Sequence, residues 1–225
     1  LRPHDCTLQA ASSAVRARIG KTVLDYSIGA PGRHIVLNSL AVLGAVHALD
    51  GDVVEAARAM GEVRPLPGRG LRRQVDMPDG AFLVIDESYN ANPTSMRAAI
   101  AVLGNAESRQ GGRRIAVIGD MLELGPSSPA LHADLAPDLE QADIDLVFTA
   151  GPDSGRLFDA LAPERRGARA ADSAALAPMV AAAVRPGDAV MVKGSAGSRM
   201  GRVVDALLAL AEEPRDKAPK RANGG

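Results

Sequence analysis

The pattern of apolar and polar positions changes near residue 65 and divides the chain into two parts. In the first part, a β-branched segment at 21–28 predicts a strand, and apolar stretches at 35–49 and 52–61 predict two helices. An Asp-Gly-Asp sequence precedes the second helix, where carboxylates stabilise a helix N-terminus. The Pro-Leu-Pro-Gly sequence at 65–68 is rigid and then flexible, which is typical of a domain boundary.

After residue 70, strands and helices alternate. Residues 71–77 and 81–86 flank a Pro-Asp-Gly turn and are predicted to form a hairpin. Successive parallel strands need crossover connections, so the alternation beyond it predicts an α/β fold, with a mainly parallel sheet and helices on both faces. The expected strands are 114–118, 146–149, a weak strand near 168, and 189–192, and the expected helices are 94–103, 129–141, 154–161, 174–184 and 199–210.

The composition excludes several classes of protein. The chain has 225 residues, and 46% of them are apolar, which is enough for a substantial core. Its 26 basic and 27 acidic residues leave no net field for a polyanion, and 2% aromatic residues offer few surfaces for stacking bases, so we expect no nucleic acid partner. No apolar stretch is long enough to span a bilayer, and the single cysteine, Cys6, cannot form an internal disulfide. We therefore expect a cytoplasmic protein without membrane insertion.

The two ends of the chain carry separate predictions. The first residue, Leu1, is not a methionine, and the chain is predicted to be a piece of a longer protein. Residues 212–225 are charged, punctuated by Pro and Gly, and lack hydrophobic periodicity, so this tail is predicted to be disordered.

Three polar segments follow predicted strands of the second part. They are Asp-Glu-Ser-Tyr-Asn-Ala-Asn-Pro at 86–93, Gly-Asp-Met-Leu-Glu-Leu-Gly at 119–125, and Lys-Gly-Ser-Ala-Gly-Ser at 193–198. Because the carboxyl ends of parallel strands lie along one edge of a sheet, we expect the three segments to converge on one cleft. Each segment alone also fits a structural role, since the amides can cap a helix, Asp120 can cap a loop, and glycines can turn the chain.

The segment at 193–198 is also a candidate anion site. Its glycines and serines precede a predicted helix whose free N–H groups attract anions, and Lys193 adds a positive charge. Ser198 fits equally as the N-cap of that helix.

Other candidate sites are weaker. Gly-Lys-Thr at 20–22 resembles the end of a phosphate-binding loop, but a strand follows it and the first glycine of the motif would fall at Val15. The histidines and Cys6 show no metal-ligand spacing. Among the histidines, only His132 is expected to line a cleft.

Taken together, the motifs resemble those of the Mur ligases, the ligases of peptidoglycan precursor synthesis. Gly-x-His-x-x-x-Asn at 32–38, Pro-Gly-Arg at 67–69, the three polar segments and His132 occur with the order and spacing of that family, from about residue 23 to 210. The members that add D-alanyl-D-alanine are the most similar. The resemblance implies that residues 1–66 are the last part of a central α/β ATP-binding domain and that residues 67–211 form a Rossmann-like C-terminal domain.

The resemblance implies an ATP-dependent ligase that forms a carbon–nitrogen bond. ATP would phosphorylate the terminal carboxylate of UDP-N-acetylmuramoyl-tripeptide, and the amine of D-Ala-D-Ala would attack the acyl phosphate. Mg²⁺ is expected, with its main ligands and the phosphate loop upstream of Leu1, so the chain alone is expected to be inactive. The protein is expected to be a monomer.

The resemblance also assigns roles to single residues. No catalytic residue and no metal ligand is assigned within the chain. Many relatives have Asp-Asp where this chain has Asp-Glu, so either carboxylate of the pair is a candidate for binding the ribose. The implied ATP-binding residues are Asn38, Arg69, Asp86, Glu87, Tyr89, Asn90 and Asn92, and the implied substrate-binding residues are Asp120, Glu123, His132, Lys193, Ser195 and Arg199.

Two alternatives stay open. A ligase of the folylpolyglutamate synthetase type shares the architecture and the use of ATP, although its corresponding motif is Asp-Gly-Ala-His-Asn-Pro. A non-catalytic Rossmann-like module that binds a small ligand or a partner protein would, like this chain, carry no phosphate loop.

Overall fold

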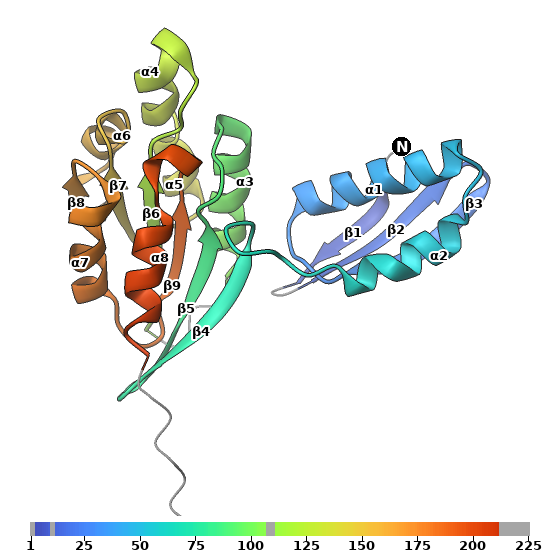
Figure 1. Ribbon diagram of the computed structural model, residues 1–225, viewed down its shortest axis with the longest axis horizontal. Coiled ribbons are helices and arrows are strands. Elements are labelled where there is room, and N and C mark those ends of the chain that lie inside the picture. The colour runs from blue at the N-terminus through green and yellow to red at the C-terminus, as the bar shows by residue number, and fades with distance from the viewer. Residues whose placement is uncertain (1–2, 10–11, 107–110, 212–225) are drawn as a thin grey trace, which may run out of the picture.

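The structure, a computed structural model, describes residues 3–9, 12–106 and 111–211 and consists of two lobes joined by a linker (Figure 1). The predicted disordered tail at 212–225 lies outside the described residues. The elements of the first lobe are β1 (Pro3–Leu8), β2 (Ser13–Ile19), β3 (Thr22–Ile28), α1 (Arg33–Ala48), α2 (Val53–Ala59) and the 3₁₀ turn η1 (Met60–Glu62). None of the described helices is both long enough and apolar enough to cross a membrane.

The first lobe is an antiparallel sheet, in the order β1-β2-β3, packed on one face by two helices. Side chains of β2 alternate strictly between buried and exposed, as expected for a sheet that is covered on one face only. β1 and β2 were not predicted; in β2 the exposed Ala14, Arg16 and Arg18 separate the buried positions, so no continuous apolar run marks the strand. Gly20, at φ 58°, makes the turn between β2 and β3, so Gly-Lys-Thr at 20–22 belongs to a hairpin and not to a phosphate-binding loop.

The N-terminus of α2 is stabilised by an acidic side chain, as the Asp-Gly-Asp sequence predicts. Asp52 is the N-cap, and its Oδ1 accepts hydrogen bonds from Val54 N at 2.9 Å and Glu55 N at 3.0 Å. These bonds satisfy two amide groups that have no partner within the helix and hold the pKa of the Asp52 carboxyl below its usual value.

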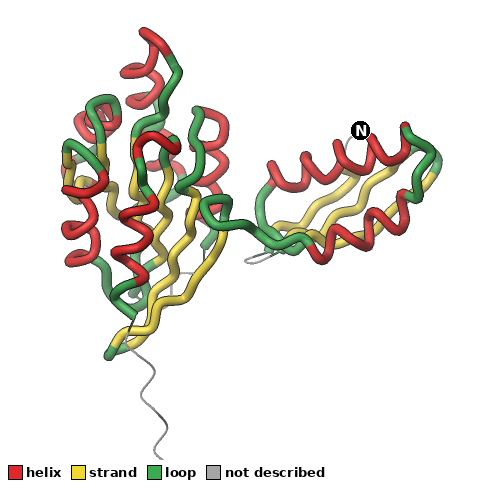
Figure 2. Tube along the Cα trace, in the orientation of Figure 1, coloured by secondary structure: helices red, strands yellow, loops and turns green. Residues whose placement is uncertain are grey.

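The second lobe is the predicted α/β fold (Figure 2). Its sheet has the strand order β4-β5-β9-β6-β7-β8, and every neighbouring pair is parallel except the β4–β5 hairpin. The strands are β4 (Leu71–Met77), β5 (Gly80–Glu87), β6 (Arg114–Gly119), β7 (Leu146–Ala150), β8 (Arg166–Ala170) and β9 (Ala189–Lys193). The helices and 3₁₀ turns are α3 (Pro93–Gly104), η2 (Gly125–Ser127), α4 (Ser128–Ala133), α5 (Ala136–Gln141), α6 (Ser154–Ala160), η3 (Pro163–Arg165), α7 (Ser173–Ala183), η4 (Ala196–Ser198) and α8 (Gly201–Leu208).

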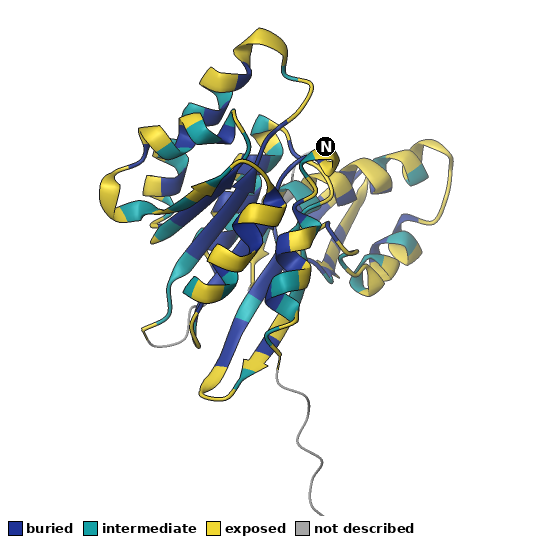
Figure 3. Cartoon of the chain, turned by 60° about the vertical axis from the view of Figure 1, so that its left-hand side comes forward, coloured by how far each residue is buried: buried dark blue, intermediate teal, exposed yellow. Residues whose placement is uncertain are grey.

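Both faces of this sheet are covered, which explains why its central strands are apolar throughout (Figure 3). All five residues of β9 are buried. One core packs α3, α5 and α6 on the face that carries Ile85, and a second core packs α7 and α8 on the face that carries Val84. Successive residues of β5 therefore point to different helices and different surroundings.

Two predicted helices differ from the observed ones. The helix expected at 129–141 is split into α4 and α5, because Pro137 has no N–H to continue the hydrogen-bond ladder. The helix expected at 199–210 begins only at Gly201, after a 3₁₀ turn and after Arg199, whose φ is 51°. The interpretation of Ser198 as an N-cap is wrong, since its hydroxyl donates to Ser195 O at 2.6 Å within that turn.

Candidate functional site

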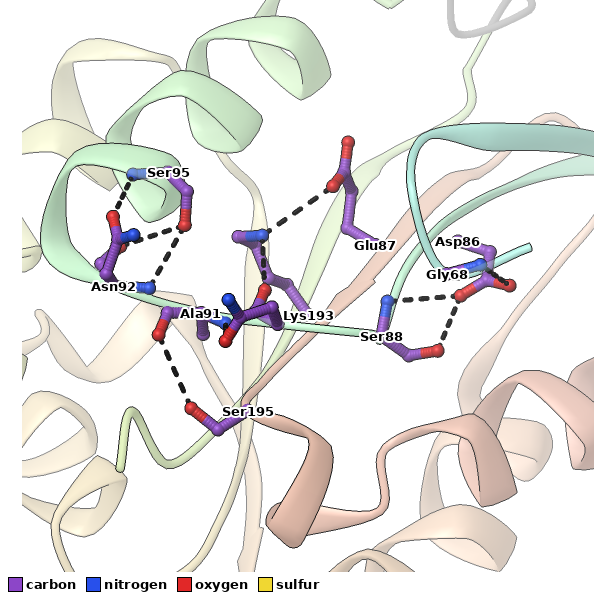
Figure 4. A network of polar contacts seen from close by, with 10 residues as sticks. Gly68, Asp86, Glu87, Ser88, Ala91, Asn92, Ser95, Lys193 and Ser195 are labelled. Carbon is purple, nitrogen blue, oxygen red and sulfur yellow. Dashed lines mark hydrogen bonds and ion pairs between the residues drawn. The ribbon is translucent and has the colours of Figure 1, made fainter. Parts of the chain in front are cut away.

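The three polar segments meet at the carboxyl edge of the sheet, as predicted, because β5, β9 and β6 are neighbours (Figure 4). Ser195 lies at the junction: its Oγ accepts from Leu122 N at 2.9 Å and donates to Ala91 O at 3.4 Å. Its backbone N donates to Asp120 O at 3.0 Å. These bonds tie the loops after β5 and β6 to the loop after β9.

Asp86 and Glu87 point away from each other, which separates their roles (Figure 4). Asp86 is 6% exposed, and its carboxylate accepts from Gly68 N at 2.8 Å, from Ser88 N at 3.1 Å and from Ser88 Oγ at 2.6 Å. Both of its oxygens are thus used within the protein. Glu87 lies on the other face of the strand, the face of Ile85 and α3.

Glu87 forms an ion pair with Lys193, its direct neighbour across the β5–β9 ladder. Glu87 Oε2 lies 3.6 Å from Lys193 Nζ, and the ammonium also donates to Asn90 O at 2.8 Å. The two side chains are 16% and 3% exposed. Lys193 is therefore an internal partner of the 86–93 loop and not an open cation.

Burial outweighs the attraction within this pair. Burial raises the pKa of the Glu87 carboxyl, although the neighbouring Lys193 charge opposes the change. Burial likewise lowers the pKa of the Lys193 ammonium, against the opposing charge of Glu87. Both charged forms are thus held at a cost, which a ligand that hydrogen-bonds to either group would reduce.

The end of the linker is fastened to the second lobe beside this pair. Gly68 N is bonded to Asp86, Tyr89 N donates to Gly68 O at 3.1 Å, and Gly70 N donates to Asp86 O at 2.8 Å. Gly68 and Gly70 have φ of 73° and 87°, a conformation that favours glycine. Arg69 between them is placed with its guanidinium 4.2 Å from the centre of the Tyr89 ring.

A narrow channel of about 20 Å³ separates this part of the second lobe from the first lobe, room for about one water molecule. His34 and Pro31 line it from the first lobe, and Arg69, Arg72 and Glu87 line it from the linker and the second lobe. Burial, and secondarily the charge of Lys193, lowers the pKa of His34, so its imidazole is neutral at pH 7.

Asn90 and Asn92, the amides of the first polar segment, have structural roles in the loop and at the start of α3. Asn92 is the N-cap of α3, and its Oδ1 accepts from Ser95 N at 2.8 Å while Ser95 Oγ accepts from Asn92 N at 3.0 Å. This reciprocal pair is a capping box. Asn90 Oδ1 accepts from Ala91 N at 2.8 Å.

Asp120 caps the next helix along the edge. Its Oδ1 accepts from Ser154 N at 2.7 Å, at the start of α6. A side chain on Gly151 would collide with this carboxylate, since a Cβ there would lie 2.4 Å from the Asp120 carboxyl carbon. Asp120 thus locks the loop after β6 to the loop after β7.

The prediction that His132 lines a cleft is wrong. Its ring has no exposed surface; Nε2 accepts from Met121 N at 2.8 Å, so Nδ1 carries the proton and donates to Ser128 O at 2.7 Å. The buried ring thus joins the 119–125 loop, at Met121, to the start of α4, at Ser128. His34 is the histidine that lines a cleft, and its place in Gly-x-His was the sequence signal that pointed to it.

Three predicted residues are exposed and lie outside these bonded contacts. Asn38 lies on α1, one turn after His34. Glu123 and Arg199 lie on the second and third polar segments with φ of 65° and 51°. Within the described residues, no group of three or more His, Cys, Asp or Glu side chains is arranged to hold a metal ion.

Comparisons with known proteins identify the family. Residues 72–196 match the family described as "Mur ligase, glutamate ligase domain". The UDP-N-acetylmuramoyl-tripeptide--D-alanyl-D-alanine ligase of Escherichia coli is 33% identical over 187 residues, which are 82% of this chain and 39% of that protein. The ligase of the same name from Mycobacterium leprae is 32% identical over 212 residues, 85% of this chain and 39% of that protein.

Solved structures agree with the sequence matches. A MurF from Acinetobacter baumannii aligns with a TM-score of 0.76 and 25% identity over 92% of this chain and 44% of that chain. The MurF ligase of Thermotoga maritima in complex with ADP has the same fold, with a TM-score of 0.73 and 22% identity over 92% of this chain and 46% of that chain. The chain spans 39% of the length of the E. coli and M. leprae relatives. As its motifs predicted, the chain belongs to the Mur ligase family.

Proposed function

We propose that this chain is the C-terminal part of an ATP-dependent ligase that joins D-Ala-D-Ala to UDP-N-acetylmuramoyl-tripeptide in peptidoglycan precursor synthesis. The observation that carries the proposal is that curated relatives 33% and 32% identical to the chain bear the name of this one reaction. In this proposal residues 1–66 complete a central ATP-binding domain and residues 67–211 form the domain that closes over it.

Glu87, and not Asp86, is proposed to bind the ribose of ATP. The Glu87 carboxylate lies on the face of the strand that lines the interlobe channel, whereas both oxygens of Asp86 are bonded to the linker and to Ser88. Two ribose hydroxyls would donate to Glu87, in the way that acidic side chains bind ribose in dinucleotide folds. Burial penalises the Glu87 charge, and the surroundings that penalise it have a low dielectric constant. Hydrogen bonds from the ribose hydroxyls to Glu87 would therefore be stronger there than in water.

The neighbouring residues would complete the nucleotide site. Arg69 and Tyr89 present a guanidinium and an aromatic ring, stacked at 4.2 Å, that suit a purine base. Asn38, exposed on α1, is proposed to contact the base from the first lobe. Asn90 and Asn92 would act through the loop they hold in place. ATP would supply the phosphoryl group that activates the carboxylate. Mg²⁺ is a proposed cofactor, and no group of three or more His, Cys, Asp or Glu side chains among the described residues is arranged to hold it.

The second and third polar segments would receive the dipeptide. Lys193 is proposed to hold its carboxylate, and this requires the ammonium to leave Glu87, which it now faces at 3.6 Å. Ribose binding to Glu87 would favour that exchange, because it gives the carboxylate new partners. Ser195, Arg199, Asp120 and Glu123 surround the same edge, and His132 would act indirectly by holding Met121.

The channel is too narrow for a nucleotide, so we propose that the lobes move apart to admit it. Gly68 and Gly70 are fastened to β5, and Val63 N donates to Met60 O in the first lobe, which leaves residues 64–67 as the segment able to hinge. Solution scattering of the full-length protein tests this motion: an interlobe geometry that is the same with and without ligands would contradict it.

The activity test is phosphate release by the full-length protein with ATP, Mg²⁺, UDP-linked tripeptide and a dipeptide. Turnover with D-Ala-D-Ala and none with L-Ala-L-Ala is the expected result. Glu87→Gln should raise KM for ATP, while Asp86→Asn should mainly lower the melting temperature. No turnover despite binding of both ATP and the tripeptide would contradict this proposal and favour a related ligase with another amine acceptor, or a non-catalytic binding module.

A further inference from the structure

A second cavity between the lobes is lined by residues that the proposed reaction does not use. It has a volume of about 730 Å³ and lies between the start of α1 and the distal half of α3. Its apolar wall includes Leu37 from α1 and Ala98, Ala101 and Val102 from α3. This volume falls in the range of small-molecule sites, roughly 300–1,000 Å³.

The cavity adjoins the interlobe channel, with which it shares Pro31, His34, Arg72 and Val102, and it extends from there away from the edge of the sheet where the ribose is proposed to bind. α3 begins at that edge, at Asn92, and the residues that line the cavity continue to Asn105 at the far end of the helix. Twelve residues of helix extend about 18 Å. Glu87, Tyr89 and Asn38 are not among the residues that line it.

The charged groups at the cavity are basic. Arg33 and Arg72 line it from opposite lobes, and none of its described lining residues is acidic. The Glu87 carboxylate lines the adjoining channel and is paired with Lys193. Two guanidinium groups thus face one apolar space without a carboxylate of their own.

Arg72 lacks an internal partner for part of its guanidinium. Its Nε is buried and has no hydrogen-bond partner in the described part of the chain. Arg72 lies opposite Ile85 in the β4–β5 ladder, so it projects on the face of the sheet that carries α3. Burial lowers the pKa of its guanidinium, which shows that the charge is held at a cost that an anion would offset.

The first turn of α1 adds to the positive electrostatic potential of the cavity. Gly32, Arg33 and His34 all line the cavity. The 16-residue helix has Gly32 as its N-cap, without a side-chain cap bond and without an acidic residue in its first turn. Its partial positive charge is therefore not neutralised by its own sequence.

We propose that this cavity is a second ligand site, which binds an organic anion with an apolar body and one carboxylate or phosphate group. The anion lies between Arg72 and the first turn of α1, and the apolar body lies against α3. Because its walls come from both lobes, a bound ligand holds the lobes at their present separation and slows any reaction that needs them to move. The binding itself does not depend on the ligase activity proposed above.

The test uses three naphthalene probes that differ only in the attached group: 1-naphthyl phosphate, 1-naphthoate and the neutral 1-naphthalenemethanol. The chain has no tryptophan, so naphthalene fluorescence anisotropy can be read without that background. At least one anion should bind saturably, and at least about tenfold more tightly than the alcohol, the value of one charge-assisted hydrogen bond. The preferred anion distinguishes a phosphate ligand from a carboxylate ligand.

Variants locate the probe. Arg72→Gln should weaken anion binding about tenfold or more, and Arg72→Lys should restore part of it, while Arg73→Gln, exposed on the same strand, should leave it unchanged. If Arg72→Gln does not fold, Ala101→Phe replaces it, since this exposed position on α3 can fill the cavity without removing a charge.

A titration with ADP separates this site from the nucleotide site. ADP, which is proposed to move the lobes apart, should weaken anion binding only to a plateau that further ADP does not change, because ligands at separate sites can occupy the protein together. An anion affinity that keeps falling in proportion to the ADP concentration would overturn the proposal of a second site, and equal binding of the alcohol, or no saturable binding, would overturn the proposal of an anion site. Neither result depends on turnover.

Discussion

Removing Lys193 alone should destabilise the protein far more than removing its partner Glu87. In Lys193→Met the Glu87 carboxylate, 16% exposed in the wild type, keeps its burial and loses its countercharge, and Asn90 O loses its donor. In Glu87→Gln, Lys193 keeps its bond to Asn90 O and can release its proton, since burial already lowers its pKa. The two single variants are therefore not equivalent.

The magnitudes follow from the cost of an unpaired buried charge. Lys193→Met should lower the free energy of unfolding by about 3 kcal/mol. Glu87→Gln should lower it by about 1 kcal/mol, the value of one hydrogen bond. The double variant replaces both charges together and should lose no more than about 1 kcal/mol, because a buried ion pair contributes little net stability. The coupling energy between the two positions is then about 3 kcal/mol.

Urea unfolding at pH 7, followed by circular dichroism, measures all four proteins. Arg202→Met, a change of charge at a position outside the pair, is the control. Since burial raises the folded-state pKa of Glu87, its contribution to stability is present below its unfolded pKa and is lost as pH rises through the folded value. Lys193→Met should accordingly regain stability as the pH falls from 7 toward 4.5. Strictly additive single effects, or a Lys193→Met variant as stable as the wild type, would refute the argument.

Three further perturbations test other parts of the site. Asn92→Ala should lower the unfolding free energy by about 1 kcal/mol through loss of the α3 cap, and Asn92→Ser should retain most of it in the same urea assay. The folded-state pKa of His34 is lowered, so its contribution to the free energy of unfolding is present above about pH 6.5 and is lost as the pH falls below that value. The loss is at most about 1.4 kcal/mol per pH unit. His34→Asn should reduce this dependence of the unfolding free energy on pH, as measured by denaturation at several pH values. His132→Phe should lower the melting temperature and should also increase amide exchange at Met121, whose N–H loses its acceptor; unchanged exchange would contradict the positioning role.

Much of the second lobe follows from local pattern. Continuous apolar runs in 114–118 and 189–192 predict buried parallel strands, and the Pro-Asp-Gly turn predicts the hairpin, because these signals need only neighbours in sequence. β2 has no continuous apolar run, since its one open face places Ala14, Arg16 and Arg18 between the buried positions. Pro137 is itself a local signal for a helix break, but the apolar periodicity of 129–141 favoured the prediction of one continuous helix.

The choice between neighbouring polar residues needed the tertiary structure. Sequence alone brought the three loops to one edge, because parallel strands with crossovers share a direction. It could not separate Asp86 from Glu87, since this depends on which face of β5 meets the linker and which meets the first lobe. It could not foresee that Lys193 is held internally by Glu87 and Asn90, or that His132 is sealed beneath its loop. The sequence by itself determined most elements of the second lobe, their order and the family, because these reside in residue types and spacing. The partners of each charge were decided only by packing, because burial and distance arise between segments far apart in the chain.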